Sequence, residues 1–256
     1  MIPQVNFKVI EFKNMFSQIN GFLSQNIKRL WDWSDVIFSQ YPDLKARLEG
    51  IEDKEERYNI CRDYFSEKYL EVKGELENNT TMFQKSWDSI NNQVMEALSK
   101  VIEVDWPEKD KNITARVSMN PICPRFIKYR VFDLYYKFTA EKMREVAVHE
   151  IQHFLFFEKW KAVFPETKEE EFDNPYLVWH LSEIAAPVIL GDKRIQEVIP
   201  QKDLHGYKEH QKVIIDGKTI IAHIQEIYDK KTSFEDFLRK SYDIVKKYEN
   251  EIRAAK

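Results

Sequence analysis

The first hundred residues carry apolar side chains at helical spacing. In three stretches these side chains recur every three or four positions, which places them on one face of an α-helix. The stretches cover residues 12–30, 52–71 and 81–101, and Pro42 and Gly50 separate the first from the second. Apolar faces of this kind usually pack into a protein core. We therefore predict a helical N-terminal portion.

The pattern changes to a period of two after Trp106-Pro107. Residues 113–119 alternate between apolar and polar side chains, as in a β-strand with one buried face. Residues 126–138 are rich in aromatic and β-branched side chains, which favour a second strand or a pair of short ones. These are the only segments before residue 139 that we expect to form a sheet.

Three further helices are predicted after this sheet, each preceded by a side chain that can cap a helix N-terminus. They cover residues 139–164, 175–190 and 233–252, with Thr139, Asn174 and Ser233 as the capping residues. Residues 213–224 allow two interpretations, because Asp216-Gly217 can close a hairpin and Thr219 can begin a helix.

The order of these elements predicts a mostly helical α+β protein. We expect a helical N-terminal portion, residues 1–105, followed by a domain of residues 106–256. The boundary is soft, because the two parts can share one core.

Composition narrows the class of protein. The chain has 256 residues, of which 43% are hydrophobic and 32% charged, as is typical of a globular protein. The net charge is −4 and basic runs are offset by acids, so we expect no nucleic-acid partner. We see no apolar run long enough to span a bilayer and no signal peptide, so we expect a cytoplasmic protein with no membrane association. Neither composition nor pattern indicates an oligomeric state.

Residues 149–153 read His-Glu-Ile-Gln-His and fall within a predicted helix. Histidines at positions i and i+4 lie one turn apart on one face, so His149 and His153 can bind the same metal ion. Glu150 stands beside the first histidine, where its carboxylate can accept a proton from a metal-activated water. The pattern predicts one Zn²⁺ per chain. The alternative is two ordinary histidines on an amphipathic helix.

The motif resembles that of the zincin metallopeptidases. The metzincin branch continues with glycine and histidine at two positions that hold Phe156 and Lys159 in this chain. The resemblance is therefore to the gluzincin branch, typified by thermolysin, which takes its third zinc ligand from a glutamate in a second, downstream helix. It implies Glu183 as this ligand. His180, one turn earlier on nearly the same face, is the alternative.

The chain departs from the gluzincin pattern after this glutamate. Thermolysin-like enzymes carry an acidic residue four positions later, which orients a histidine ligand, whereas this chain has Pro187. Asp173 or Ser182 would then have to take that role.

The resemblance also implies where a substrate binds. Gluzincins hold an extended peptide along an exposed sheet strand about thirty residues before the metal helix, by addition of a strand. Ser118 and Asn120 fall at this distance and are the expected substrate-binding residues. An ordinary core strand is the alternative.

Gluzincins place a side chain that stabilises the oxyanion after the glutamate helix. His205 and Tyr207, in a predicted loop, are the candidates for this catalytic role. His210 and His223 are further alternatives.

The resemblance covers about residues 112–191. It implies a zincin-like fold, in which a small sheet packs on the His-Glu-Ile-Gln-His helix, and a zinc-dependent metallopeptidase that cleaves a peptide or protein substrate. The alternative is a non-enzymatic or latent protein on a zincin scaffold, whose helical N-terminal half binds a protein partner.

Overall fold

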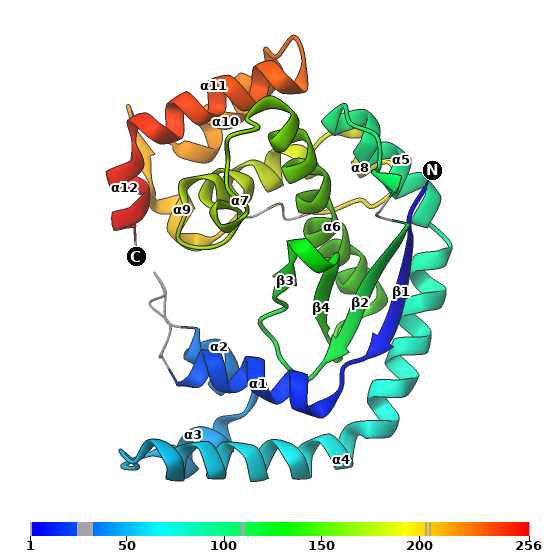
Figure 1. The fold of residues 1–256 in the computed structure, drawn as a ribbon, viewed down its shortest axis with the longest axis vertical. Helices are drawn as coiled ribbons and strands as arrows, with labels where there is room; N and C mark the ends of the chain where they lie inside the picture. The colour runs from blue at the N-terminus through cyan, green and yellow to red at the C-terminus, as the bar shows by residue number, and fades with distance from the viewer. Residues whose placement is uncertain (1, 25–32, 109–110, 203, 205, 256) are drawn as a thin grey trace. The chain divides into compact units, whose positions relative to one another are not determined.

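The computed structural model describes residues 2–24, 33–108, 111–202, 204 and 206–255. The protein is mostly helical with a small mixed sheet, as expected for an α+β protein (Figure 1). Its chain forms two compact units, which we call the sheet unit and the helical unit. The sheet unit comprises Val5–Ser89 and Asn112–Ala147, and the helical unit comprises Met1–Gln4, Ile90–Lys111 and Val148–Lys256. The division thus differs from the predicted one near residue 105, because each unit combines separated segments.

A four-stranded sheet forms the centre of the sheet unit, in the order β1-β2-β4-β3. These strands are β1 (Gln4–Val9), β2 (Asn112–Ser118), β3 (Arg125–Phe126) and β4 (Val131–Tyr135). Strand β2 runs parallel to β4, and β3 runs antiparallel to it. Residues 126–138 therefore supply the pair of short strands that was one of the two predictions.

The sequence prediction missed strand β1. Its apolar residues Val5 and Phe7 are buried and alternate with exposed polar ones. The Ile10 N–H donates to Val117 O, which continues the pairing of this segment with β2. The alternation was present in the sequence, but it extends over six residues only.

Four helices complete the sheet unit: α1 (Phe12–Leu23), α2 (Ser34–Gln40), α3 (Pro42–Leu48) and α4 (Lys54–Asp88). The end of the predicted helix 12–30 lies outside the described residues. Helix α4 is continuous where the sequence predicted a break between residues 71 and 81. The hydroxyls of Thr80 and Thr81 donate to the carbonyls of Leu76 and Glu77, four residues back. Such bonds keep threonine within a helix and favour bending, and α4 is visibly bent (Figure 1).

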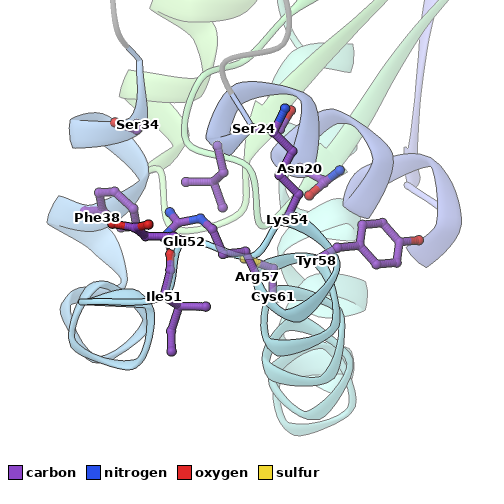
Figure 2. A pocket seen from close by; sticks show the side chains of 11 residues that line it. Asn20, Ser24, Ser34, Phe38, Ile51, Glu52, Lys54, Arg57, Tyr58 and Cys61 are labelled. Atoms are coloured by element: carbon purple, nitrogen blue, oxygen red, sulfur yellow. Dashed lines mark hydrogen bonds between the residues drawn. The ribbon is translucent and has the colours of Figure 1, made fainter.

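A hollow of about 500 Å³ lies among α1, α2 and α4 (Figure 2). Its lining combines apolar side chains, such as Phe38 and Tyr58, with the charged Glu52 and Arg57. The Arg57 guanidinium donates to the carbonyls of Leu48 and Ile51. Arg57 therefore holds the end of α3 in place, and this structural role explains why a charged side chain lines the hollow.

The helical unit is built around α7 (Leu177–Leu190), in which every residue is buried. Apart from His180, Ser182 and Glu183 its residues are apolar, as expected for a helix at the centre of a core. The other elements of this unit are α5 (Asn91–Ile102), α8 (Lys193–Gln196), α9 (Lys208–Lys212), β5 (Ile214–Ile215), β6 (Lys218–Thr219), α10 (Ile220–Asp229), α11 (Phe234–Lys247), α12 (Glu249–Ala254) and a 3₁₀ turn at Glu169–Phe172. None of the described helices combines the length and hydropathy needed to cross a membrane.

Helix α6 (Ala140–Val163) continues from the sheet unit into the helical unit. The Lys142 N–H donates to Thr139 Oγ1, so the predicted N-cap of this helix is confirmed. Ser233 Oγ likewise accepts from the Asp236 N–H at the start of α11. Asn174, in contrast, is not a cap, because α7 begins at Leu177 after Tyr176 and has no side-chain cap.

The ambiguous segment 213–224 contains both predicted structures. Strands β5 and β6 form a hairpin, and Asp216 and Gly217 occupy the positive-φ positions of its turn. Thr219 then caps α10 by accepting from the Ala222 N–H. The predicted final helix 233–252 is divided, because α11 ends at Lys247 and α12 begins at Glu249.

Candidate metal centre

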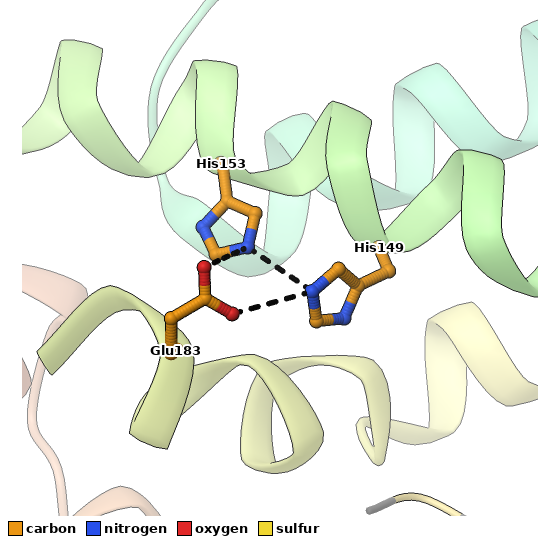
Figure 3. Close-up of side chains that lie close together, drawn as sticks. All are labelled: His149, His153 and Glu183. Carbon is orange, nitrogen blue, oxygen red and sulfur yellow. Dashed lines mark hydrogen bonds and ion pairs between the residues drawn. The ribbon is translucent and has the colours of Figure 1, made fainter. Parts of the chain in front are cut away.

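Helix α6 presents His149 and His153 on one face, one turn apart (Figure 3). Their Nε2 atoms are 3.3 Å apart, so both rings point to a common position. The helix between Ala140 and Val163 contains neither glycine nor proline, which keeps the i, i+4 geometry regular. The local sequence therefore fixes the relative placement of the two imidazoles.

Helix α7 supplies the third side chain of the cluster, Glu183 (Figure 3). The small residues Ser182, Ala185 and Ala186 flank it in the sequence, and all are buried. Small side chains let two helices approach closely, which a carboxylate needs in order to reach imidazoles on a neighbouring helix. The structure thus brings together His149, His153 and Glu183, the three ligands expected from the sequence.

The separations within the cluster match those of zinc ligands. Glu183 Oε2 lies 3.4 Å from His149 Nε2, and Glu183 Oε1 lies 3.6 Å from His153 Nε2. Two ligand atoms that bind the same Zn²⁺ in tetrahedral geometry are about 3.3 Å from each other. Among the described residues, no other group of three or more His, Cys, Asp or Glu side chains has donor atoms close enough to hold a metal. A His₂Glu donor set suits zinc best.

Burial of the cluster makes a cation favourable there. His153 is 0% and Glu183 1% exposed, whereas the side chain of His149 is 27% exposed. Moving a carboxylate out of water is costly unless an opposite charge compensates it. A divalent ion at the meeting point would satisfy the carboxylate and both imidazoles. His149 is the one member of the cluster that is partly exposed to solvent.

Glu150 follows His149 in α6 and is 7% exposed. Successive residues project about 100° apart around a helix, so this carboxylate lies beside the metal-binding face rather than on it. It is not part of the ligand cluster. This position suits the predicted role of Glu150 as a proton acceptor.

Gln152 is a residue of interest that the sequence analysis missed. It precedes His153 and is fully buried, and neither its amide oxygen nor its amide nitrogen has a hydrogen-bond partner among the described residues. Buried amides normally have hydrogen-bond partners, so Gln152 is an unusual residue beside the two histidines. The only signal in the sequence was a glutamine inside an otherwise apolar helix face.

His180, the alternative third ligand, is instead paired with His210 of α9. The atoms His180 Nδ1 and His210 Nε2 are 2.9 Å apart, and both residues are fully buried. The rings of Trp179 and Tyr207 contact this pair. His180 is therefore not in the cluster that Glu183 forms with the α6 histidines.

Burial lowers the pKa of both paired histidines. The pKa of His180 falls to about 3, because burial disfavours the imidazolium and the nearby His210 and Arg253 oppose a further positive charge. The pKa of His210 falls to about 4, again through burial. The Glu183 carboxylate opposes both shifts. Both rings are therefore neutral in the folded protein at neutral pH.

These shifts predict that the metal-free protein loses stability as the pH decreases. In the unfolded chain both histidines regain their ordinary pKa of 6.5, so below this pH the unfolded state binds more protons than the folded state. We expect the free energy of unfolding to fall by up to about 1.4 kcal/mol per pH unit for each histidine, down to the folded-state pKa. Urea unfolding between pH 7 and pH 5, with a chelator present, measures this.

A double variant isolates the contribution of the pair. In His180→Asn/His210→Gln the amide groups replace the bonded Nδ1 and Nε2 atoms but do not titrate. Its free energy of unfolding should depend less on pH than that of the wild type. Equal pH dependence in the two proteins would contradict the assignment.

The candidate oxyanion donors differ in their surroundings. Tyr207 is half-buried at the start of α9, and its ring packs on Trp179 with 5.7 Å between centroids. His223 Nε2 is 2.8 Å from Ile215 O, so this ring is engaged with the β5–β6 hairpin. His205 lies outside the described residues.

Ser118 and Asn120 are not on an exposed strand. Both are fully buried in the sheet unit, and β2 lies between β1 and β4. The carbonyl of Ser118 accepts from the Tyr136 N–H, and that of Met119 accepts from the Tyr41 hydroxyl. The structure thus contradicts the expectation that this segment offers backbone groups to a peptide. The alternative of a core strand fits Ser118, because the unpredicted β1 pairs with the edge of β2 that would otherwise be exposed.

Ser182 and Asp173, the candidates for orienting a histidine ligand, have other environments. The Ser182 hydroxyl donates to Trp179 O within α7. Asp173 is exposed before α7. The Ser182 hydroxyl is thus bonded within its own helix.

No protein-family model, curated protein or solved structure matches this chain. Function is therefore inferred from the chemistry of the metal centre.

Proposed function

We propose that this protein is a zinc-dependent metallopeptidase of the gluzincin type. The observation that carries the proposal is the convergence of His149, His153 and Glu183, with donor atoms 3.3 to 3.6 Å apart. Two of these residues were expected from their spacing and the third from the resemblance to gluzincins. Catalytic zinc sites typically have three protein ligands and keep a further position for water or substrate.

A bound Zn²⁺ would lower the pKa of a water molecule and polarise the carbonyl of a peptide bond. His149 and His153 would hold the ion through their Nε2 atoms, and Glu183 would contribute the compensating negative charge. Glu150 accepts the proton of the attacking water and returns it to the leaving amine. Glu150 is 7% exposed and follows the first histidine in α6, which places its carboxylate close to the cluster.

The partial exposure of His149 favours an enzymatic rather than a purely structural ion. His153 and Glu183 are enclosed, so water and substrate would approach from the side of His149. We retain Tyr207 and His205 as the proposed donors to the oxyanion. Tyr207 lies in the segment that packs on α7 beside the third ligand.

Metal removal tests this proposal. Zinc bound at one hundred times its dissociation constant should raise the free energy of unfolding by about 2.7 kcal/mol. We expect a chelator to lower the midpoint of urea unfolding, and to abolish cleavage of a fluorogenic peptide library. Added zinc should restore both. An unfolding midpoint that neither chelator nor zinc changes would contradict the proposal.

A latent zinc protein is the second candidate. Pro187 favours it, because this residue cannot supply the acidic group that thermolysin-like enzymes use to orient a histidine ligand. In this case zinc would stabilise the helical unit without hydrolysis, and the N-terminal half would bind a protein partner. Zinc-dependent stabilisation without any cleavage would favour this candidate.

A further inference from the structure

The two buried histidines, His180 and His210, join the helix of the third ligand to a later segment of the chain. His180 lies in α7 one turn before Glu183, on the same side of the helix. Its Nδ1 atom is 2.9 Å from Nε2 of His210 in α9. This contact links residues thirty positions apart in the sequence, and one of them is three residues from Glu183.

Further contacts extend this link along α7. The ring of Tyr207 packs on Trp179, one turn before Glu183. Gly206 lies beside the helix, since a Cβ atom at this position would be in van der Waals contact with Glu183 O, at 3.7 Å. Gly206, Tyr207 and His210 thus all lie against α7.

Two features of α7 weaken the hydrogen bonding near Glu183, although its side chains are packed on every side. Its N-cap, Tyr176, makes no side-chain capping bond. Pro187 has no N–H to donate to the carbonyl of Glu183, so the helical hydrogen-bond ladder does less to fix the backbone at this ligand. Apolar contacts have no preferred direction, whereas a hydrogen bond requires a defined distance and angle between its partners.

We infer that His180 and His210 are positioning residues, which hold α7 so that Glu183 meets His149 and His153 in the geometry of a zinc site. The inference rests on the proposed function, because it assumes that the cluster binds zinc. Neither histidine contacts substrate in this role. Loss of groups that orient metal ligands typically reduces metal affinity by about 10- to 100-fold.

Amide side chains allow a matched test at each position. Asparagine places its amide where the Nδ1 atom of histidine lies, and glutamine places it where Nε2 lies. His180→Asn and His210→Gln therefore keep the bond between α7 and α9. His180→Gln and His210→Asn carry the same amide group displaced by one carbon, so they lose this hydrogen bond.

Zinc affinity, measured by competition with a chromophoric chelator, is the readout. We expect His180→Gln and His210→Asn to bind zinc about 10- to 100-fold more weakly than the wild type, and the two matching amides to stay within about threefold. The visible spectrum of the Co²⁺-substituted protein should change only in the first two variants. His223→Gln is the control, because this histidine is bonded to Ile215 O, and its affinity should be unchanged.

The outcomes separate this inference from the proposed function. A wild type that binds no zinc overturns both. If the wild type binds zinc, two results overturn the inference alone. One is equal zinc affinity in all variants. The other is equal weakening of zinc binding by asparagine and glutamine at the same position. If a single variant is unfolded without metal, the zinc affinity of the double variant His180→Asn/His210→Gln tests the inference instead. Affinity near that of the wild type supports the inference, and a loss of about tenfold or more contradicts it.

Discussion

Glu183→Gln is expected to abolish tight zinc binding and leave the protein folded. The substitution keeps the size of the side chain but removes the negative charge of the third ligand, and a neutral amide oxygen is a poor ligand for Zn²⁺. We expect zinc affinity to fall by about two orders of magnitude or more. Elemental mass spectrometry after dialysis should find one zinc per wild-type chain and little in the variant.

The metal-free form of this variant provides the internal check. Glu183 is 1% exposed, and burying a neutral amide costs less than burying a carboxylate. The metal-free variant should therefore be at least as stable as the metal-free wild type. Glu197→Gln, at an exposed glutamate that follows α8, is the control with the same charge change. Full zinc occupancy in Glu183→Gln would exclude Glu183 as a ligand.

Glu150→Gln should have the opposite effect, with loss of hydrolysis and retention of zinc. Glutamine cannot accept a proton from the attacking water, while His149, His153 and Glu183 remain in place. General acid–base catalysis is worth about 10²- to 10⁴-fold in rate, so kcat should fall by this factor. The assay is cleavage of a fluorogenic peptide library by zinc-loaded protein.

A second glutamate in the same helix provides the matched control. Glu141 is exposed in the first turn of α6, and Glu141→Gln should leave both the zinc content and the rate unchanged. Cleavage by Glu150→Gln at the wild-type rate would show that Glu150 is not the proton acceptor. Cleavage by neither the wild type nor the variant, with zinc bound to both, would favour the latent protein.

Local geometry explains which features the sequence could predict. The separation of His149 and His153 follows from the pitch of one helix, and the caps Thr139 and Ser233 act within a single turn. Each of these features depends on residues only a few positions apart. The placement of Glu183 came from the resemblance to gluzincins, since it depends on the packing of two helices.

Features that depend on distant contacts escaped prediction. Strand β1 exists because it pairs with β2, which lies more than one hundred residues later in the sequence. Its omission led directly to the error at Ser118, whose strand is covered rather than exposed. The pairing of His180 with His210 likewise joins α7 to α9, and no periodicity in either segment indicates it.

X-ray absorption spectroscopy at the zinc edge, on the zinc-loaded wild type, tests the central claim most directly. The proposed centre predicts a first shell of nitrogen and oxygen only, at about 2.0 to 2.1 Å. The outer-shell signal should correspond to two imidazoles, with Glu183 and a solvent oxygen completing the coordination. Three or more imidazoles, a sulfur ligand at about 2.3 Å, or the absence of bound zinc would contradict the account.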